Sequence, residues 1–304
     1  MTPPGPRPRV AYAKPPLSYE QQVALLISNG MSVVDPMAAA ETLKRVNYYR
    51  LSGYWHAFKQ PDGRIAPGTA LTEVLRLYEF DRELRGLLVD ALERFEVQLR
   101  TAVAYTLALR WGPFAHETTA AFRPWPGHAE WLARLREETS RSRETFVLHH
   151  HARYLEFPAL PVWVAAEVMT LSSVSRLYEA MQRPDRRAVA AEFGIHHDVL
   201  RSWVHTLAYV RNICARHLRL WNRGLAIKPD LPWRDPHWNA PWVLGNHRIY
   251  TVLLMLRHVT QGHHAADDWA GSAVELLQRM DAHPQCLLPM GMPADWREHP
   301  LWRV

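Results

Sequence analysis

The sequence has very little cysteine and no long apolar run. Its 304 residues include two cysteines, Cys214 and Cys286, which are too few for a disulfide framework or a cysteine-based zinc site. The proline-rich start of the chain lacks the apolar core of a signal peptide, and no later run of about 18 apolar residues could span a membrane. We therefore expect a soluble protein of the reducing cytoplasm with no membrane partner.

Several signatures of enzymes and metal sites are also missing. No segment resembles a βαβ unit, a glycine-rich loop that cradles phosphates, or the elbow that presents a nucleophilic serine. His149, His150 and His151 are adjacent, but neighbours in sequence point about 100° apart on a helix and do not converge on one ion. The sequence therefore predicts no metal site and no cofactor.

The sequence does contain ample apolar residues and a modest excess of positive charge. Hydrophobic residues make up 48% of the chain, which is enough for a large core. Thirty-six Lys and Arg against 30 Asp and Glu give a net charge of +6, with 17 His in addition. This balance favours acidic partners such as nucleic acid, although it does not establish such binding by itself.

Helical periodicity dominates the chain after its first residues. Residues 1–16 contain six prolines and one glycine, a composition that cannot pack and that predicts a disordered or extended arm. From Ser18 onward, capping residues and apolar spacings of three and four predict successive helices. We expect residues 17–304 to form a single all-α domain, with residues 228–304 as a Pro- and Trp-rich extension packed on it.

The longest uninterrupted helical period covers residues 71–111. At about 1.5 Å per residue one helix of this length would span roughly 60 Å, so we expect a break near Gly86. Within it, Glu96 and Arg100 form an i,i+4 pair, whose ordinary role is a few tenths of a kcal/mol of helix support. An alternative role is to orient charged side chains of the stretch 209–223.

The stretch 209–223 is the strongest candidate for chemistry. It combines Arg211, Asn212 and His217 within an otherwise aromatic and aliphatic helical pattern. Arginine is a permanently charged phosphate binder, asparagine a neutral hydrogen-bonding amide, and histidine a group that moves protons near pH 7. These side chains meet the needs of a ribonuclease that works without a metal.

Helix geometry divides these side chains between two faces. The helix is predicted from about residue 198 to 222, and with Arg211 at 0° it places Asn212 at about 100° and His217 at about 240°. His217 then lies among apolar residues, as a core or interface side chain that reaches an active site only across a dimer interface. The polar face carries a basic stripe suited to phosphates, made of Arg216, Arg219 and Arg223.

Two further patterns have a structural and a functional interpretation. Arg50 lies among the aromatic residues of segment 47–55, where it is a candidate RNA contact, although packing of the aromatic rings between helices is favoured. Ala190, Gly194 and Leu200 have the spacing of a helix-turn-helix whose second helix begins at His197. That helix is too apolar to lie in DNA, so a structural αα-turn is favoured.

Six motifs stand in order along the chain: Lys14-Pro15-Pro16, Tyr48 to Trp55, Tyr78 to Arg85, Pro161-Val162-Trp163 with Glu167, Arg211 to Ala215, and Leu220 to Arg223. Together they resemble bacterial abortive-infection proteins of the AbiD/AbiF-like kind. The resemblance covers about Lys14 to Trp296 and implies a HEPN-type helical bundle with additional helices. Members of the HEPN superfamily are mostly metal-independent RNA endonucleases.

The resemblance also implies roles for individual residues. Arg211 would stabilise charge on the phosphate, Asn212 would be its polar neighbour, and His217 would transfer protons. Many relatives have His-His where this chain has Arg216-His217, so Arg216 is an alternative catalytic position. The implied activity is RNA cleavage in phage defence at a homodimer interface, controlled by a bound structured noncoding RNA or an inhibitory antitoxin.

Two other functions stay open on the sequence alone. A non-catalytic RNA-binding protein or scaffold would use the same basic stripe without turnover. A helix-turn-helix regulator would bind duplex DNA through the helix beginning at His197, and it would need exposed polar residues along that helix.

Overall fold

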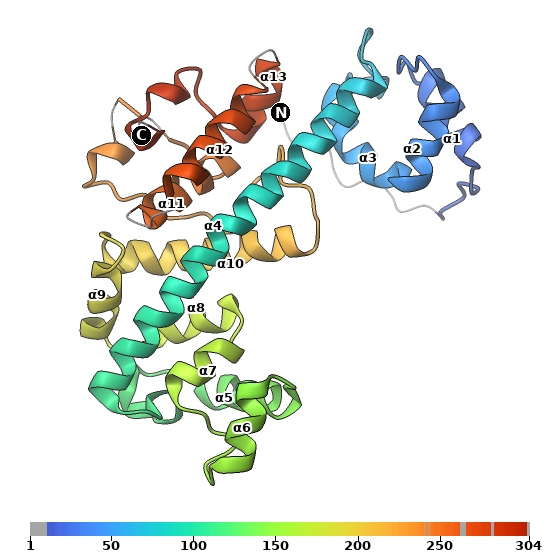
Figure 1. Cartoon of the computed structure of the whole chain (residues 1–304). Helices are drawn as coiled ribbons and strands as arrows, with labels where there is room; N and C mark the ends of the chain where they lie inside the picture. The colour runs from blue at the N-terminus through green and yellow to red at the C-terminus, as the bar shows by residue number, and fades with distance from the viewer. Residues whose placement is uncertain (1–10, 240, 243, 262–265, 281–282, 303–304) are drawn as a thin grey trace. The chain divides into compact units, whose positions relative to one another are not determined.

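The computed structural model describes residues 11–239, 241–242, 244–261, 266–280 and 283–302. This part of the chain forms α-helices, short 3-10 helices and loops, with isolated β-bridges but no strands (Figure 1). The predicted all-α fold class is confirmed. Of the predicted N-terminal arm, residues 1–10 lie outside the described residues, while residues 11–16 are exposed and have no regular secondary structure.

The chain divides into two compact units, Met1–Phe80 and Asp81–Val304. The sequence predicts one domain over residues 17–304, whereas this division gives residues up to Phe80 a unit of their own. The predicted extension over residues 228–304 is not separated by the division and stays a prediction.

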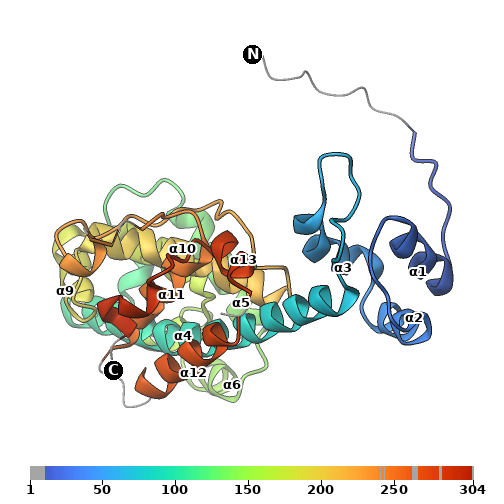
Figure 2. The same ribbon diagram turned by 90° about the horizontal axis from the view of Figure 1, so that it is seen from above.

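Two packed helices, α1 (Tyr19–Ser28) and α2 (Pro36–Arg45), begin the first unit (Figure 2). The Ser18 hydroxyl forms a capping box with Gln21 at the start of α1, and the Asp35 carboxylate accepts backbone N–H groups at the start of α2. These caps pair donors that a helix start otherwise leaves unpaired, which explains why both helices begin there.

The aromatic segment around Arg50 forms α3 (Tyr48–Trp55) of the first unit. Tyr54 and Trp55 are buried, and the Tyr54 ring packs edge-on against Tyr78. The Arg50 guanidinium lies 5.8 Å from the centre of the Tyr78 ring, within the range of a cation–π contact. Tyr54 and Trp55 therefore pack in the interior, as favoured from the sequence. Arg50 contacts Tyr78, the ring against which Tyr54 packs.

The long helical period forms one uninterrupted helix, α4 (Leu71–Trp111), of 41 residues. The break expected near Gly86 does not occur, so that prediction is wrong. Leu84 and Leu88, on either side of Gly86, are fully buried. Their packing outweighs the cost of glycine in a helix interior, which is about 1 kcal/mol relative to alanine.

Shorter helices follow α4 in the second unit. They are α5 (His128–Arg141), α6 (Thr145–Arg153), α7 (Val162–Val168), α8 (Leu171–Ala180) and α9 (Arg183–Ala191). A short break at Met169 and Thr170 separates α7 from α8. The break is local, because the Thr170 hydroxyl accepts the Ser173 N–H and so caps a new helix.

α10 (His197–Ala215) has α8 and α9 packed on it (Figure 1). Leu200, Trp203 and Val204 are fully buried. The apolar face of α10 is packed inside the protein and is not available to a DNA groove. The structure therefore favours the αα-turn and gives the DNA-binding regulator no support.

The second unit ends with α11 (Ile249–Thr260), α12 (Ala266–Gln278) and α13 (Pro284–Leu287). The Pro- and Trp-rich loop before α11 is fastened to α10, because Trp238 is buried 5.1 Å from the Trp203 ring and the Trp203 indole donates to the loop. Short 3-10 helices lie at His56–Phe58, Ala115–Glu117, Thr119–Ala121, Pro236–Trp238, Leu288–Met290, Trp296–Glu298 and Pro300–Trp302. Within the described part of the chain, no helix has the length and apolar character needed to cross a bilayer.

Candidate functional site

A groove of about 410 Å³ lies in the second unit where α4 meets the C-terminal end of α10. Glu96 and Arg100 reach it from α4, and Arg211 reaches it from α10. Val89 and Val97 of α4 also line it and are 45% and 54% exposed. The structure therefore brings together three of the charged residues singled out from the sequence, beside an apolar wall.

Glu96 stands between two arginines in this groove. Its carboxylate lies 2.5 Å from Arg100 Nη2 and 3.8 Å from Arg211 Nε. Only 10% of the Glu96 side chain is exposed, against 44% of the Arg211 side chain. Because the close contact is with Arg100, the guanidinium of Arg211 keeps the larger exposed surface for an anion. If Glu96 orients the Arg211 guanidinium, it has to make contacts such as these. That Glu96 has this role stays a prediction.

Arg100 is fixed by contacts with the C-terminal end of α7 and the residue that follows it. Its Nη2 also donates to the Met169 carbonyl at 2.8 Å, and its Nη1 lies 3.9 Å from the Glu167 carboxylate. Its Nε is buried and has no hydrogen-bond partner among the described residues. A buried donor without a partner is costly, and the other two nitrogens of Arg100 make the contacts that hold the side chain in place.

Asn212, the neighbour of Arg211, is exposed and only loosely held. Its Nδ2 lies 3.4 Å from the Ser172 hydroxyl of α8, which is long for a hydrogen bond. Among the described residues, those that line the groove do not include Asn212. The amide can turn toward a bound molecule without breaking a strong contact.

α10 ends at Ala215, well before the predicted end at residue 222. The His217 N–H donates to the Cys214 carbonyl at 2.9 Å and the Leu218 N–H to the Ile213 carbonyl at 3.0 Å. With a φ of 53° at His217, these two bonds make a Schellman motif, in which histidine holds the left-handed position that glycine usually takes. The helix prediction beyond Ala215 is wrong because this capping motif stops the helix despite the apolar spacing that follows.

Two expectations that depended on the longer helix are corrected with it. His217 is exposed, instead of buried on an apolar helix face. Arg216 is the C-terminal cap of α10, and Arg219 and Arg223 follow in the non-helical segment, where Arg223 Nε donates to the Arg219 carbonyl at 2.6 Å. These three arginines stay candidates for RNA contact, but they do not form a stripe along one helix.

A buried acid, Asp81 of α4, holds the segment that follows α10. Its carboxylate accepts the N–H groups of Leu220 at 3.1 Å and Trp221 at 2.7 Å, and it pairs with Arg85 Nη1 at 2.5 Å. Arg85 Nη1 also lies 3.3 Å from the Leu218 carbonyl. Sequence reasoning missed this anchor, although an Asp and an Arg four residues apart in an apolar helical period were the available signal.

A family model described as Abi-like protein matches residues 41–222, more than half of the chain. The chain belongs to this family. The match includes the groove residues of α4 and α10 and the segment that Asp81 holds. Membership in the family supports a role in abortive infection and confirms that part of the resemblance, while the AbiD/AbiF-like subtype and the HEPN superfamily stay predictions. No curated protein and no solved structure matches the chain.

In this Abi-like protein the groove presents the exposed guanidinium of Arg211 to an anion. Arginine presents a planar set of N–H donors that matches phosphate oxygens, and Glu96 limits the positions that Arg211 can take. Proton transfer requires a further group, for which the exposed His217 is the candidate. Arg50 belongs to the first unit and stays a separate candidate for RNA contact.

Proposed function

We propose that this Abi-like protein is a metal-independent endoribonuclease of the HEPN superfamily that acts in phage defence. The observation that carries the proposal is the groove between α4 and α10, where a nearly buried Glu96 contacts an Arg211 whose guanidinium is exposed. The spacing of Arg211, Asn212 and His217 supports it, because it fits the pattern of HEPN nucleases that the resemblance implies.

The proposed reaction is attack of a ribose 2′-hydroxyl on its own 3′-phosphate. His217 removes the hydroxyl proton, the bond from the 2′-oxygen to phosphorus forms, and the bond from phosphorus to the 5′-oxygen breaks. Arg211 stabilises the negative charge that builds on the phosphoryl oxygens, with Asn212 as a neutral donor. The leaving 5′-oxygen takes up a proton from water and His217 returns its proton to the solvent, so the products are a 2′,3′-cyclic phosphate and a 5′-hydroxyl end.

In this proposal a second copy of the chain completes the site. Among the described residues, those that line the groove do not include His217, and in the proposal this residue comes from the partner. α4 exposes apolar side chains beside the groove and further along the helix, with Val97 at 54%, Tyr105 at 67% and Leu109 at 71% exposure. Apolar side chains exposed along one helix are typical of a surface that a partner covers, which supports a homodimer formed through α4.

Control by a bound structured RNA is also part of the proposal. Arg216, Arg219, Arg223 and Arg50 are the candidate contacts, since arginine side chains bind phosphates of any sequence. An antitoxin that covers the groove is the alternative means of control.

The decisive experiment measures RNA cleavage by the untagged protein in the presence of EDTA. We expect cleavage with 2′,3′-cyclic phosphate and 5′-hydroxyl ends, and a loss of about 100-fold or more in Arg211→Ala. Arg201→Ala is the matched control, because Arg201 lies on the same helix, is 40% exposed and pairs with Glu179 at the surface. A protein that binds RNA but never cleaves it in EDTA contradicts the proposal and supports the RNA-binding scaffold.

Mixing two inactive variants tests the composite site. In a dimer that pairs Arg211→Ala with His217→Asn, one of the two sites regains both native residues if Arg211 and His217 come from different copies. We expect mixing to restore a measurable fraction of the wild-type cleavage rate. No recovery in a mixture shown to form mixed dimers would place both residues in one copy.

A further inference from the structure

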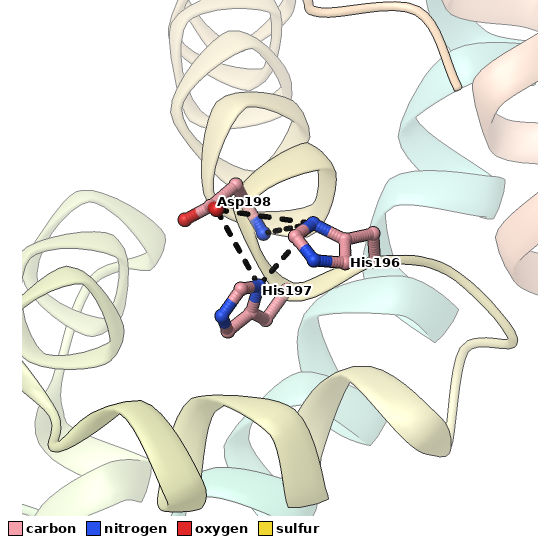
Figure 3. A group of neighbouring side chains, drawn as sticks. All are labelled: His196, His197 and Asp198. Carbon is pink, nitrogen blue, oxygen red and sulfur yellow. Dashed lines mark hydrogen bonds and ion pairs between the residues drawn. The ribbon is translucent and has the colours of Figure 1, made fainter. Parts of the chain in front are cut away.

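Three potential metal ligands converge at the N-terminal end of α10 (Figure 3). His196 precedes the helix with φ −68° and ψ 141°, and His197 and Asp198 are its first two residues. Because the chain changes direction at His196, the side chains of these adjacent residues can meet. The argument against a metal on adjacent histidines, which assumes an unbroken helix, does not hold here.

The three atoms form a triangle whose size suits a transition-metal ion. His196 Nδ1 lies 3.3 Å from His197 Nδ1, and Asp198 Oδ2 lies 3.8 Å and 3.6 Å from those two nitrogens. Zinc binds imidazole nitrogen and carboxylate oxygen at about 2.0–2.2 Å, and a point about 2.1 Å from all three corners fits inside such a triangle. The three atoms are therefore close enough to share an ion, which on His196 Nδ1 would replace the long contact of 3.4 Å from the Asp198 N–H.

A second layer of contacts fixes the orientation of these ligands. The buried Arg186 places Nη1 3.2 Å from Asp198 Oδ1, which leaves Oδ2 on the side of the histidines. The Tyr178 hydroxyl donates to the His197 carbonyl at 3.1 Å. Outer contacts of this kind hold metal ligands in a fixed orientation.

We propose that His196, His197 and Asp198 form a binding site for a divalent transition-metal ion of the zinc class. Two imidazoles and one carboxylate are three of the four ligands that tetrahedral zinc takes. The fourth position is open to water or a ligand, because the side chains of His196 and Asp198 are 61% and 52% exposed. His196 also lines a cavity of about 360 Å³ together with Trp233 and Asp235, so a small ligand there would lie beside the ion.

Arg183 competes with the ion in this arrangement. Its Nε donates to His197 Nε2 at 3.2 Å, which places the ring proton of a neutral His197 on Nδ1. A metal on Nδ1 requires that proton on Nε2, so Arg183 has to release the ring. Arg183 is exposed at the start of α9 and can turn into solvent. Removal of Arg183 is therefore expected to tighten metal binding, which sets this site apart from a chance pair of surface histidines.

Titration of the untagged full-length protein with Co²⁺, followed by visible absorption, tests the site. We expect ligand-field bands of four-coordinate Co²⁺ that Zn²⁺ displaces. His196→Gln and Asp198→Asn are each expected to weaken binding at least about 10-fold, because loss even of an outer contact costs 10- to 100-fold. Arg183→Gln is expected to tighten binding by roughly 2- to 10-fold, the value of one net hydrogen bond.

His205→Gln is the matched control, because His205 is an exposed histidine on the same helix, and it should bind Co²⁺ as the wild type does. Circular dichroism in the absence of metal verifies that each variant is folded. The proposal is overturned if the bands are absent, if His196→Gln binds as tightly as His205→Gln, or if Arg183→Gln binds more weakly than the wild type.

Discussion

The two ends of α10 carry chemical groups that are arranged in opposite ways. At the N-terminal end, three consecutive side chains meet because His196 lies outside the helix. At the C-terminal end, Arg211 lies in a groove with Glu96, while His217 stands on the turn that ends the helix. The difference teaches that helix ends, and not spacing on an ideal helix, decide which side chains can act together.

The largest expected effect concerns what holds the C-terminal end in place. Asp81→Asn removes a buried charge that binds Arg85 and the N–H groups of Leu220 and Trp221. Breaking a buried pair from one side costs about 3–5 kcal/mol, so we expect the free energy of unfolding, measured in urea, to fall by about 3 kcal/mol.

The control for Asp81→Asn is Asp90→Asn on the same helix. Asp90 pairs with Arg94 at the surface, where its side chain is 49% exposed, and such a pair contributes about 1 kcal/mol or less. Equal free energies of unfolding for the two variants would mean that Asp81 does not hold the segment after α10. The position of His217 at the C-terminal end of the helix would then need another explanation.

An intermediate effect is expected from the contact that positions Arg211. Glu96→Gln keeps the size of the side chain but removes the charge beside Arg100 and Arg211. Misplacement of a catalytic group costs on the order of 10- to 100-fold, so we expect a loss of this size in the single-turnover rate of RNA cleavage.

Glu137→Gln is the control for Glu96→Gln, because Glu137 does not line the groove and its side chain is 57% exposed in a surface pair with Arg141. Its cleavage rate should stay within about two-fold of wild type, since surface changes away from close contacts have small effects. Thermal unfolding of both variants separates positioning from stability. A Glu96→Gln protein that loses stability and activity in parallel would identify Glu96 as a structural residue only.

The smallest expected effect tests whether the two ends act independently. Asp198→Asn removes one proposed metal ligand at the N-terminal end, and dialysis against EDTA removes the ion itself. Because the proposed cleavage uses Arg211 and His217 without a metal, we expect both treatments to change the rate by less than about two-fold, within the usual effect of a distant surface change. Abolition of cleavage by EDTA would show that the chemistry needs a metal.

Local patterns made the fold class and part of the site predictable. Ser18 caps its helix as expected, and the i,i+4 spacing of Glu96 and Arg100 gives the close pair found in the groove. The end of α10 was not predictable in the same way. A histidine in the left-handed position is unfavourable on its own. The turn is stabilised by the hydrogen bonds that the Asp81 carboxylate accepts from Leu220 and Trp221, more than a hundred residues away in sequence.

The left-handed backbone of His217 has a consequence for mutagenesis. Its φ of 53° lies where most side chains crowd the following carbonyl, at a cost of roughly 1–2 kcal/mol, while asparagine and glycine tolerate it. Alanine at this position would remove the imidazole and also weaken the turn that ends the helix carrying Arg211. Asparagine and glycine variants keep the turn and differ from the wild type chiefly in the missing ring. They, rather than alanine, are the substitutions that report on proton transfer at this residue.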